Sequence, residues 1–236
     1  MANLIRNLVP KEGIVSSFMK LHFCFFLLAL PASMYAQDDV IHFSFPVKVG
    51  NRDVQMGATV ECSDVYGGWG VRIGKLGYKD TLHSDEIRGH VYLPDSVIVP
   101  DGRRLAIKWT ADGSFQNCIH ITGVRLPEPL VYLSVNTFRD CKSLREITIP
   151  AETKHIFPFA FAGCDSLRRI TFLPLDVPRG FVEQNFNDRY KRTATLVMDA
   201  RAAESYMSSV LCTGFHYHAE LIPRWTDSLE KKQSNP

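Results

Sequence analysis

Cys141-Lys-Ser-Leu-Arg-Glu-Ile-Thr-Ile-Pro150 recurs 23 residues later as Cys164-Asp-Ser-Leu-Arg-Arg-Ile-Thr-Phe-Leu173. A more divergent copy begins 23 residues earlier, at Cys118. A phenylalanine precedes each cysteine by three positions: Phe115, Phe138 and Phe161. A fixed period of this length indicates a solenoid, because one such coil of chain cannot bury its apolar face alone. The repeat therefore predicts a stack of coils and directs the search for function towards binding rather than catalysis.

The end of each repeat has the pattern of a β-strand. Apolar residues alternate there, as in Ile147-Thr-Ile149, which is typical of a strand with one buried face. Pro127 and Pro150 end their strands because proline cannot donate to a sheet ladder. Strands that repeat the same inward positions stack in parallel through right-handed crossovers. We therefore predict a right-handed solenoid with a parallel β-sheet and short helical or irregular return arms, such as residues 156–161.

The repeat weakens at both ends, which is typical of capping elements. Residues 89–94 resemble the strand motif, and Asp101-Gly102 signals a hairpin turn. Residues 194–198 read as a last strand, and residues 200–211 as a closing helix that covers the open edge of the sheet. We expect a β-rich N-terminal cap and a helical C-terminal cap.

Four regions follow from this organisation. Residues 1–36 are predicted to be a signal peptide cleaved after Ala36, with translation starting at Met19, because a basic start precedes a short apolar run and a small residue. Residues 37–88 form a β-rich region, either a cap, which we favour, or a small separate β unit. Residues 89–222 form the solenoid with its caps, and residues 223–236 a polar tail.

Charge and hydropathy exclude two classes of partner. Once residues 1–36 are removed, basic and acidic residues are equal in number. Nucleic-acid binders carry a basic surface that neutralises phosphates, so we predict no nucleic-acid partner. The apolar run of the signal is too short to span a bilayer, and we predict no transmembrane segment. The expected location is the periplasm, the cell surface or the extracellular medium of a bacterium.

The repeated cysteines have three possible roles. Stacked coils would place Cys118, Cys141 and Cys164 in a buried ladder, where each acts as a small apolar side chain. A disulfide within the ladder is less favoured, because stacked positions hold the Cβ atoms further apart than a disulfide prefers. Zinc is less favoured still, since no Cys-x-x-Cys occurs.

The repeats resemble the BspA-like leucine-rich-repeat family, whose unit is Cys-x-x-Leu-x-x-Ile-x-Leu-Pro with an Ala-Phe-x-x-Cys return. Cys141–Pro150 and Ala160–Cys164 match it nearly position for position, within a resemblance that covers about residues 89–220. The first repeat departs from the pattern at Ile121 and at Gly123, which we read as loosening the strand. The resemblance implies a leucine-rich-repeat fold and an exported or surface protein without catalytic motifs; several members are adhesins or protein-binding scaffolds.

The residues between the inward positions are predicted to face outward on the concave sheet. One row includes Tyr92 and ends at Val197. Solenoids bind partners across such surfaces, and arginine and tyrosine are frequent anchors of interfaces. The alternative is that these are ordinary solvated positions. The candidate partner-binding residues are Tyr92, Arg125, Arg145, Glu146, Thr148, Arg168, Arg169 and Thr171.

Other motifs predict no catalytic, cofactor or metal site. His216 and His218 would share one side of a strand, but no third ligand lies near them in the sequence. Cys212 has His216 four residues on, without the positioned base and oxyanion site that a thiolate nucleophile needs. The Tyr66–Gly70 stretch is either a turn with a packed tryptophan, which we favour, or an aromatic platform for sugar.

Three functions remain to be compared. We favour an exported, non-enzymatic binding module, adhesin-like in character, that recognises a protein or glycan partner, host-derived in one version, through the concave sheet. The alternative is a structural or assembly subunit of a cell-surface complex, held by its N-terminal β region. An enzyme acting at residues 37–88 is disfavoured, because no nucleophile, paired carboxylate or phosphate loop stands out there.

Overall fold

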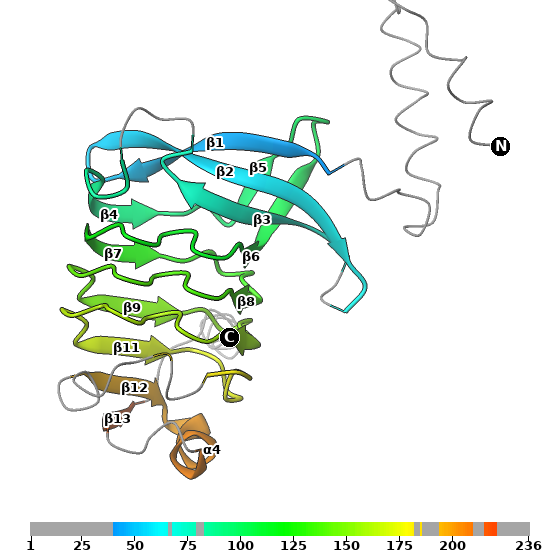
Figure 1. Ribbon diagram of the computed structural model, residues 1–236. Coiled ribbons are helices and arrows are strands. Elements are labelled where there is room, and N and C mark those ends of the chain that lie inside the picture. The colour runs from blue at the N-terminus through cyan, green and yellow to red at the C-terminus, as the bar shows by residue number, and fades with distance from the viewer. Residues whose placement is uncertain are drawn as a thin grey trace, which may run out of the picture. The chain divides into compact units, whose positions relative to one another are not determined.

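The computed structural model describes residues 40–65, 68–78, 83–181, 185, 194–209 and 215–220, so the predicted signal peptide and polar tail lie outside it. These residues are mostly strand (Figure 1). The strands are β1 (His42–Val49), β2 (Arg52–Ser63), β3 (Gly68–Leu76), β4 (Arg88–Tyr92), β5 (Ser96–Ile98), β6 (Arg104–Thr110), β7 (His120–Arg125), β8 (Tyr132–Leu133), β9 (Glu146–Ile149), β10 (His155–Ile156), β11 (Arg169–Phe172), β12 (Thr195–Asp199) and β13 (His216–Glu220). The helical elements are η3 (Ala200–Ala202) and α4 (Ala203–Ser208).

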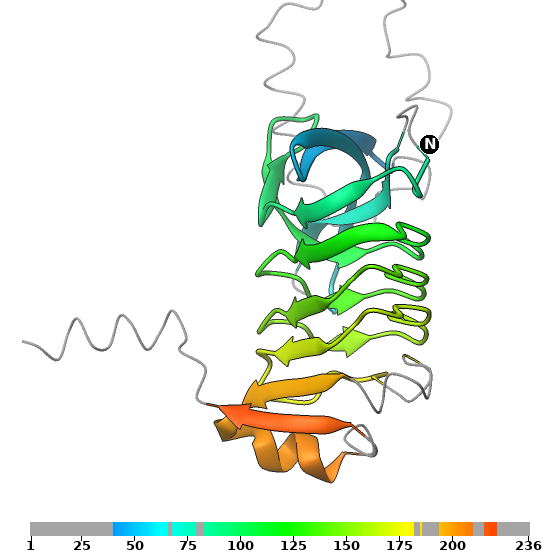
Figure 2. The same cartoon turned by 90° about the vertical axis from the view of Figure 1, so that its left-hand side faces the viewer.

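The repeat strands form a parallel layer in the register that the period predicts. Strands β4, β7, β9, β11 and β12 pair in this order, and Figure 2 shows them stacked in successive levels. Ile147 lies opposite Val124 on one side and Ile170 on the other, and all three side chains are buried. The parallel pairing of the repeat strands is therefore confirmed.

The return arms are more regular than the sequence predicted. Strands β6, β8 and β10 pair in parallel and form a second, shorter layer. This layer joins the first through β3, β2 and β1 in one continuous sheet, which is not closed. Periodicity could not reveal the second layer, because β8 and β10 are only two residues long. Neither strand is long enough to show an alternating pattern.

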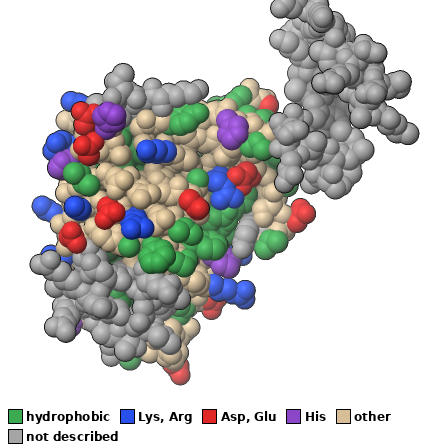
Figure 3. All heavy atoms as spheres, viewed as in Figure 1, with side chains coloured by type: hydrophobic (Ala, Val, Ile, Leu, Met, Phe, Trp, Pro, Cys, Tyr) green, Lys and Arg blue, Asp and Glu red, His purple; other side chains and the backbone are tan. Residues whose placement is uncertain are grey.

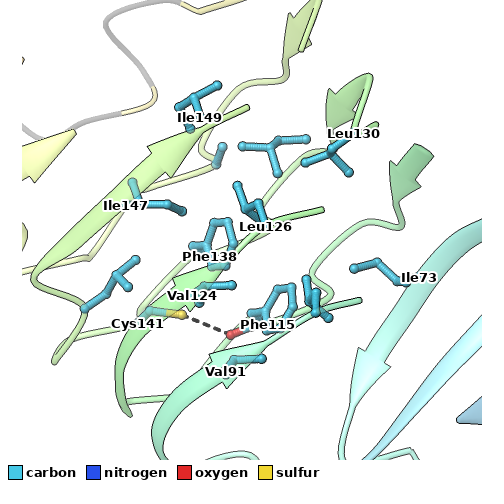
Figure 4. Packing of buried hydrophobic residues seen from close by; sticks show 14 of the residues in the cluster. Ile73, Val91, Phe115, Val124, Leu126, Leu130, Phe138, Cys141, Ile147 and Ile149 are labelled. Carbon is cyan, nitrogen blue, oxygen red and sulfur yellow. Dashed lines mark hydrogen bonds between the residues drawn. The ribbon is translucent and has the colours of Figure 1, made fainter. Parts of the chain in front are cut away.

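The core between the two layers is a continuous stack of repeated side chains (Figure 4). Phe138 packs between Phe115 and Phe161, with ring centroids 4.9 Å and 5.8 Å away and nearly parallel rings. The Cys141 thiol donates a hydrogen bond to the Phe115 carbonyl at 3.1 Å, and the Cys164 thiol makes the same contact with Phe138. The predicted interior spine of phenylalanines and thiols is confirmed.

Two positions in every coil hold a left-handed backbone. One series is Gly113, Asn136 and Phe159, and the other is Asn117, Asp140 and Gly163, each with a spacing of 23 residues. Glycine and asparagine adopt positive φ readily, whereas a bulky side chain there costs about 1–2 kcal/mol. Phe159, at φ 62°, departs from this rule, and its side chain is exposed.

The N-terminal β region continues both layers. Strands β1, β2 and β3 pair antiparallel, as expected for residues 37–88, but they are longer than the short strands predicted. Strand β1 also pairs with β4, where Val49 lies opposite Val91, and β3 pairs with β6. Because this region is hydrogen-bonded to both parallel layers, the pairings support its interpretation as a cap.

The C-terminal elements differ from the prediction. The helical segment divides into η3 and α4, and the end of the predicted helix, from residue 210, lies outside the described residues. The edge beyond β12 is taken by β13, not by the helix. Tyr206 of α4 instead packs against Phe172, at 5.3 Å between ring centroids, and donates a hydrogen bond to the Pro174 carbonyl at 3.1 Å.

Candidate functional site

The eight candidate residues come together on the outer face of the parallel layer, defined here as the solvent-facing side of β4, β7, β9 and β11. Tyr92 lies opposite Arg125, Glu146 opposite Arg169, and Thr148 opposite Thr171. Arg145 and Arg168 immediately precede β9 and β11. Tyr92 is 51% exposed, Thr171 is half-buried, and the other six residues are exposed. Whether these residues bind a partner is taken up below.

Val197 does not belong to this face as an accessible residue. It lies opposite Thr171, as the repeat predicted, but its side chain is buried. The outward row of the sequence therefore ends at Thr171, and the interpretation of Val197 as a surface position is wrong.

A shallow hollow of about 330 Å³ opens on the outer face. Arg125, Glu146, Thr148, Arg169 and Thr171 all line it. The hollow also contacts His90, which the sequence analysis did not identify. The predicted residues thus meet around one depression, which is a geometry that can receive a protruding side chain of a partner.

His90 is placed by a glycine that the sequence analysis misread. Its ring contacts the Tyr92 ring at 4.5 Å between centroids. A Cβ added to Gly123 would lie 2.5 Å from Nδ1 of His90, so only glycine leaves room for this ring. Gly123 therefore admits the imidazole rather than loosening the strand. A glycine inside a strand is a recognised sign of such a close approach.

Arg125 fixes the turn that follows β4. It donates to the Leu93 carbonyl at 2.6 Å and pairs with the Asp95 carboxylate at 3.0 Å. Asp95 also accepts the backbone N–H of Glu128 at 3.0 Å. Burial raises the pKa of Asp95, but the hydrogen bonds from Arg125 and Glu128 outweigh it, and the net pKa is lowered. Arg125 is therefore a structural clamp as well as a candidate anchor.

The other cations on the face fall into two groups. Arg169 pairs with Glu220 at 3.3 Å, but both side chains are about half exposed, so this pair contributes about 0–1 kcal/mol. Arg145 and Arg168 have no carboxylate partner among the described residues. The Arg168 amide donates to the Arg145 carbonyl at 2.8 Å, which places the two residues on neighbouring levels. Like charges side by side are unfavourable, so an anionic group of a partner would be attracted here.

The remaining candidates do not assemble into a site. His216 and His218 lie on β13, and the described part of the chain holds no cluster of three metal ligands. Cys212 and Tyr66 lie outside the described residues. Trp69 is half-buried, with the Arg103 guanidinium 4.9 Å from its ring, so that ring face is covered by a cation.

The stacked thiols are chemically quiet. Burial raises the pKa of Cys118 to about 12, and it raises the pKa values of Cys141 and Cys164 well above the ordinary value. The thiolate, which is the nucleophilic form, is therefore scarce at neutral pH. Cys62, on β2, is exposed. All four are free thiols, so the cysteine ladder is a packing feature.

We expect iodoacetamide to separate these two kinds of cysteine. In the native chain Cys62 should be alkylated, whereas Cys118, Cys141 and Cys164 should react only after unfolding in urea, because burial blocks access and suppresses the thiolate. Peptide mass spectrometry after timed labelling measures each site. Native labelling of Cys141 as fast as that of Cys62 would contradict a buried ladder.

Comparison with known proteins places the repeat region. A family model described as a BspA-type leucine-rich-repeat region matches residues 106–178, in six copies. No curated protein matches the chain. Within the part of the chain that the structure describes, no helix is long and apolar enough to cross a bilayer.

Solved structures of leucine-rich-repeat proteins are also similar. One from Bacteroides capillosus is 22% identical, with a TM-score of 0.43, over 65% of this chain and 98% of that one. A leucine-rich cell-surface protein from Faecalibacterium prausnitzii is 17% identical, with a TM-score of 0.43, over 78% of this chain and 44% of that one. The family match confirms the resemblance noted in the repeats: the chain carries a BspA-type leucine-rich-repeat region.

Proposed function

We propose that this chain is an exported, non-enzymatic interaction module that binds a protein partner through the outer face of its parallel layer. The observation that carries the proposal is the hollow on that face, around which five of the eight predicted residues gather. Leucine-rich-repeat architectures bind across extended sheet surfaces of this kind. In this proposal the coils form a right-handed solenoid, with β1–β3 as one cap and the α4–β13 segment as the other.

The side chains on the face favour an anionic or aromatic contact surface on the partner. Tyr92 and His90 form an aromatic pair at one end of the hollow. Arg145 and Arg168 supply positive charge that no described carboxylate neutralises. Tyrosine and arginine contribute a large share of the energy in measured interfaces. A small number of coils offers a limited area, so an adhesin-like role would depend on many copies displayed on one surface.

The assembly alternative has less support. It required the N-terminal β region to be free to hold a larger complex. Strands β1 and β3 are already paired with β4 and β6, so this region is engaged within the fold. We therefore propose that residues 37–88 are a cap and that the outer face is the docking surface.

The triple variant Tyr92→Ser, Arg145→Ser, Arg168→Ser tests this proposal. Its probes are fibronectin, laminin, fibrinogen and type IV collagen, immobilised for surface plasmon resonance against the full chain without its signal segment. We expect any partner found to lose at least about tenfold in affinity, because these side chains make the exposed contacts without holding the fold. Arg125 is left intact, since its clamp on Leu93 and Asp95 would confuse binding with stability.

The matched control removes two exposed cations from the other layer, Lys75→Ser and Arg104→Ser, on β3 and β6. This control should bind like the wild-type chain. Equal affinities of the triple variant and the wild type for a captured partner would move the docking surface elsewhere.

A further inference from the structure

A second group of aromatic side chains lies on the outer side of the return layer, away from the residues discussed so far. Trp109, Tyr132 and His155 stand opposite one another on β6, β8 and β10. Phe157 contacts both neighbouring rings, at 5.7 Å from Tyr132 and 6.0 Å from His155 between centroids. Phe157 is 36% exposed, so an aromatic surface faces solvent at this point.

Positive charge gathers beside these rings. Arg179 bridges to His155 at the edge of β10, and Lys154 precedes His155. The pKa of His155 is lowered by burial and then by Arg179 and Lys154, with no carboxylate among the causes. Neither cation has an acidic partner among the described residues. The Arg72 guanidinium lies 5.4 Å from the Tyr132 ring centre, but it is held by Glu61.

A hollow of about 700 Å³ adjoins the cationic end of this surface. Lys154, His155 and Arg179 line it on one side. Pro174, Leu175 and Pro178 supply apolar walls, and Glu152 and Asp176 also contact it. Its volume falls within the range of small-ligand sites, about 300–1,000 Å³. Figure 3 shows one face of the molecule on which hydrophobic side chains gather beside a histidine.

We propose that the rings of Tyr132, His155 and Phe157, with Lys154, Arg179 and the adjoining hollow, form a second binding site, and that it takes a short acidic oligosaccharide. The apolar face of a pyranose ring stacks on an aromatic ring, while its carboxylate or sulfate group pairs with the two cations. Charge-assisted contacts of this kind are stronger than neutral hydrogen bonds, and they account for the requirement for an anionic sugar.

The same contacts argue against an extended peptide at this place. A peptide that adds a strand needs a free sheet edge. The edge of β10 is occupied here, because Ile156 donates to the Arg179 carbonyl at 2.9 Å and Arg179 donates to the Lys154 carbonyl at 2.8 Å. What is left open is the ring surface and the cations. These groups recognise the face and the charge of a ligand rather than a backbone.

Isothermal titration of the full chain with four probes tests the site. Trigalacturonate carries carboxylates, a heparin tetrasaccharide carries sulfates, maltotriose is neutral, and hexaglutamate is an acidic peptide. We expect binding of trigalacturonate, of the heparin fragment or of both, at least about tenfold tighter than maltotriose or hexaglutamate. Binding should weaken as salt rises, because charge contributes to it.

Two variants assign any binding to the proposed residues. Lys154→Gln with Arg179→Gln keeps the side-chain lengths similar and should lower affinity for the acidic sugar by at least about tenfold. Phe157→Ser should do the same if its thermal unfolding shows that it remains folded. The Lys75→Gln, Arg104→Gln control removes the same charge from other strands and should bind normally. Failure of both acidic sugars to bind, equal binding of hexaglutamate, or unchanged affinity in the Lys154 and Arg179 variant would each overturn the site.

Discussion

Replacement of Cys141 by aspartate should abolish cooperative folding. The thiol is fully buried and donates to the Phe115 carbonyl in the middle of the stack. A carboxylate there cannot donate that hydrogen bond, and its charge would lose its water without gaining a cationic partner. The effective penalty for such a buried ion is several kcal/mol, which approaches the total stability of about 5–15 kcal/mol of an ordinary protein. Circular dichroism during urea titration measures the loss.

Two variants separate burial of charge from other effects. Cys62→Asp places the same side chain at an exposed cysteine of β2 and should change the free energy of unfolding by less than about 0.5 kcal/mol. Cys141→Ala removes the thiol without adding charge and should cost on the order of 1 kcal/mol. A Cys141→Asp chain that unfolds at the same urea concentration as Cys62→Asp would contradict the buried position of the thiol ladder.

The spine could be derived from the sequence because every coil repeats it. Phe115, Phe138 and Phe161 are equivalent positions of one unit, so a single inference about burial applies three times over. The same period fixed the inward side of β7, β9 and β11, and with it the outward residues now found around the hollow. A regular repeat converts a local pattern into a long-range contact, which an ordinary sequence does not do.

Features that occur once were missed, and the reason is physical. The second layer depends on the two-residue strands β8 and β10, which carry no readable alternation. The packing of His90 on Gly123 joins two strands whose register shifts beside the glycine, so the period does not announce it. The aromatic surface at Tyr132, His155 and Phe157 depends on this same layer. It could therefore not be assembled before β8 and β10 were placed side by side.

The ion pairs were also beyond the sequence. Arg125 was predicted as a free anchor, but its guanidinium reaches back to Leu93 and Asp95. Alternation gives the side of a strand on which a side chain emerges, and it does not give the direction in which a long flexible side chain then turns. For this reason Arg145 and Arg168 are now preferred over Arg125 as the residues that meet a partner.

Phe138→Ala should be the most damaging truncation in the spine, because this ring is stacked on both sides. Removing a buried phenylalanine costs about 3–5 kcal/mol, from lost burial and from the cavity that remains. Coils of a repeat protein are stabilised mainly by their neighbours, so a cavity at this level weakens the coupling between the coils on either side. We expect a lower urea midpoint by circular dichroism and an earlier loss of structure in the C-terminal coils. The fluorescence of Trp69 and Trp109, on β3 and β6, should report a later transition on the N-terminal side.

Phe138→Leu is the matched control for this prediction, because leucine keeps most of the apolar volume. It should cost about 1–1.5 kcal/mol and leave the two probes with one common midpoint. Phe115→Ala, tested alone and together with Phe138→Ala, measures the coupling between adjacent rings, and contacting residues should be non-additive by about 0.5–3 kcal/mol. If the two substitutions instead add as independent sites, the rings do not act as a continuous stack. Each coil would then be stabilised largely by its own contacts, and the stability of the chain could not be attributed to the spine that the repeat encodes.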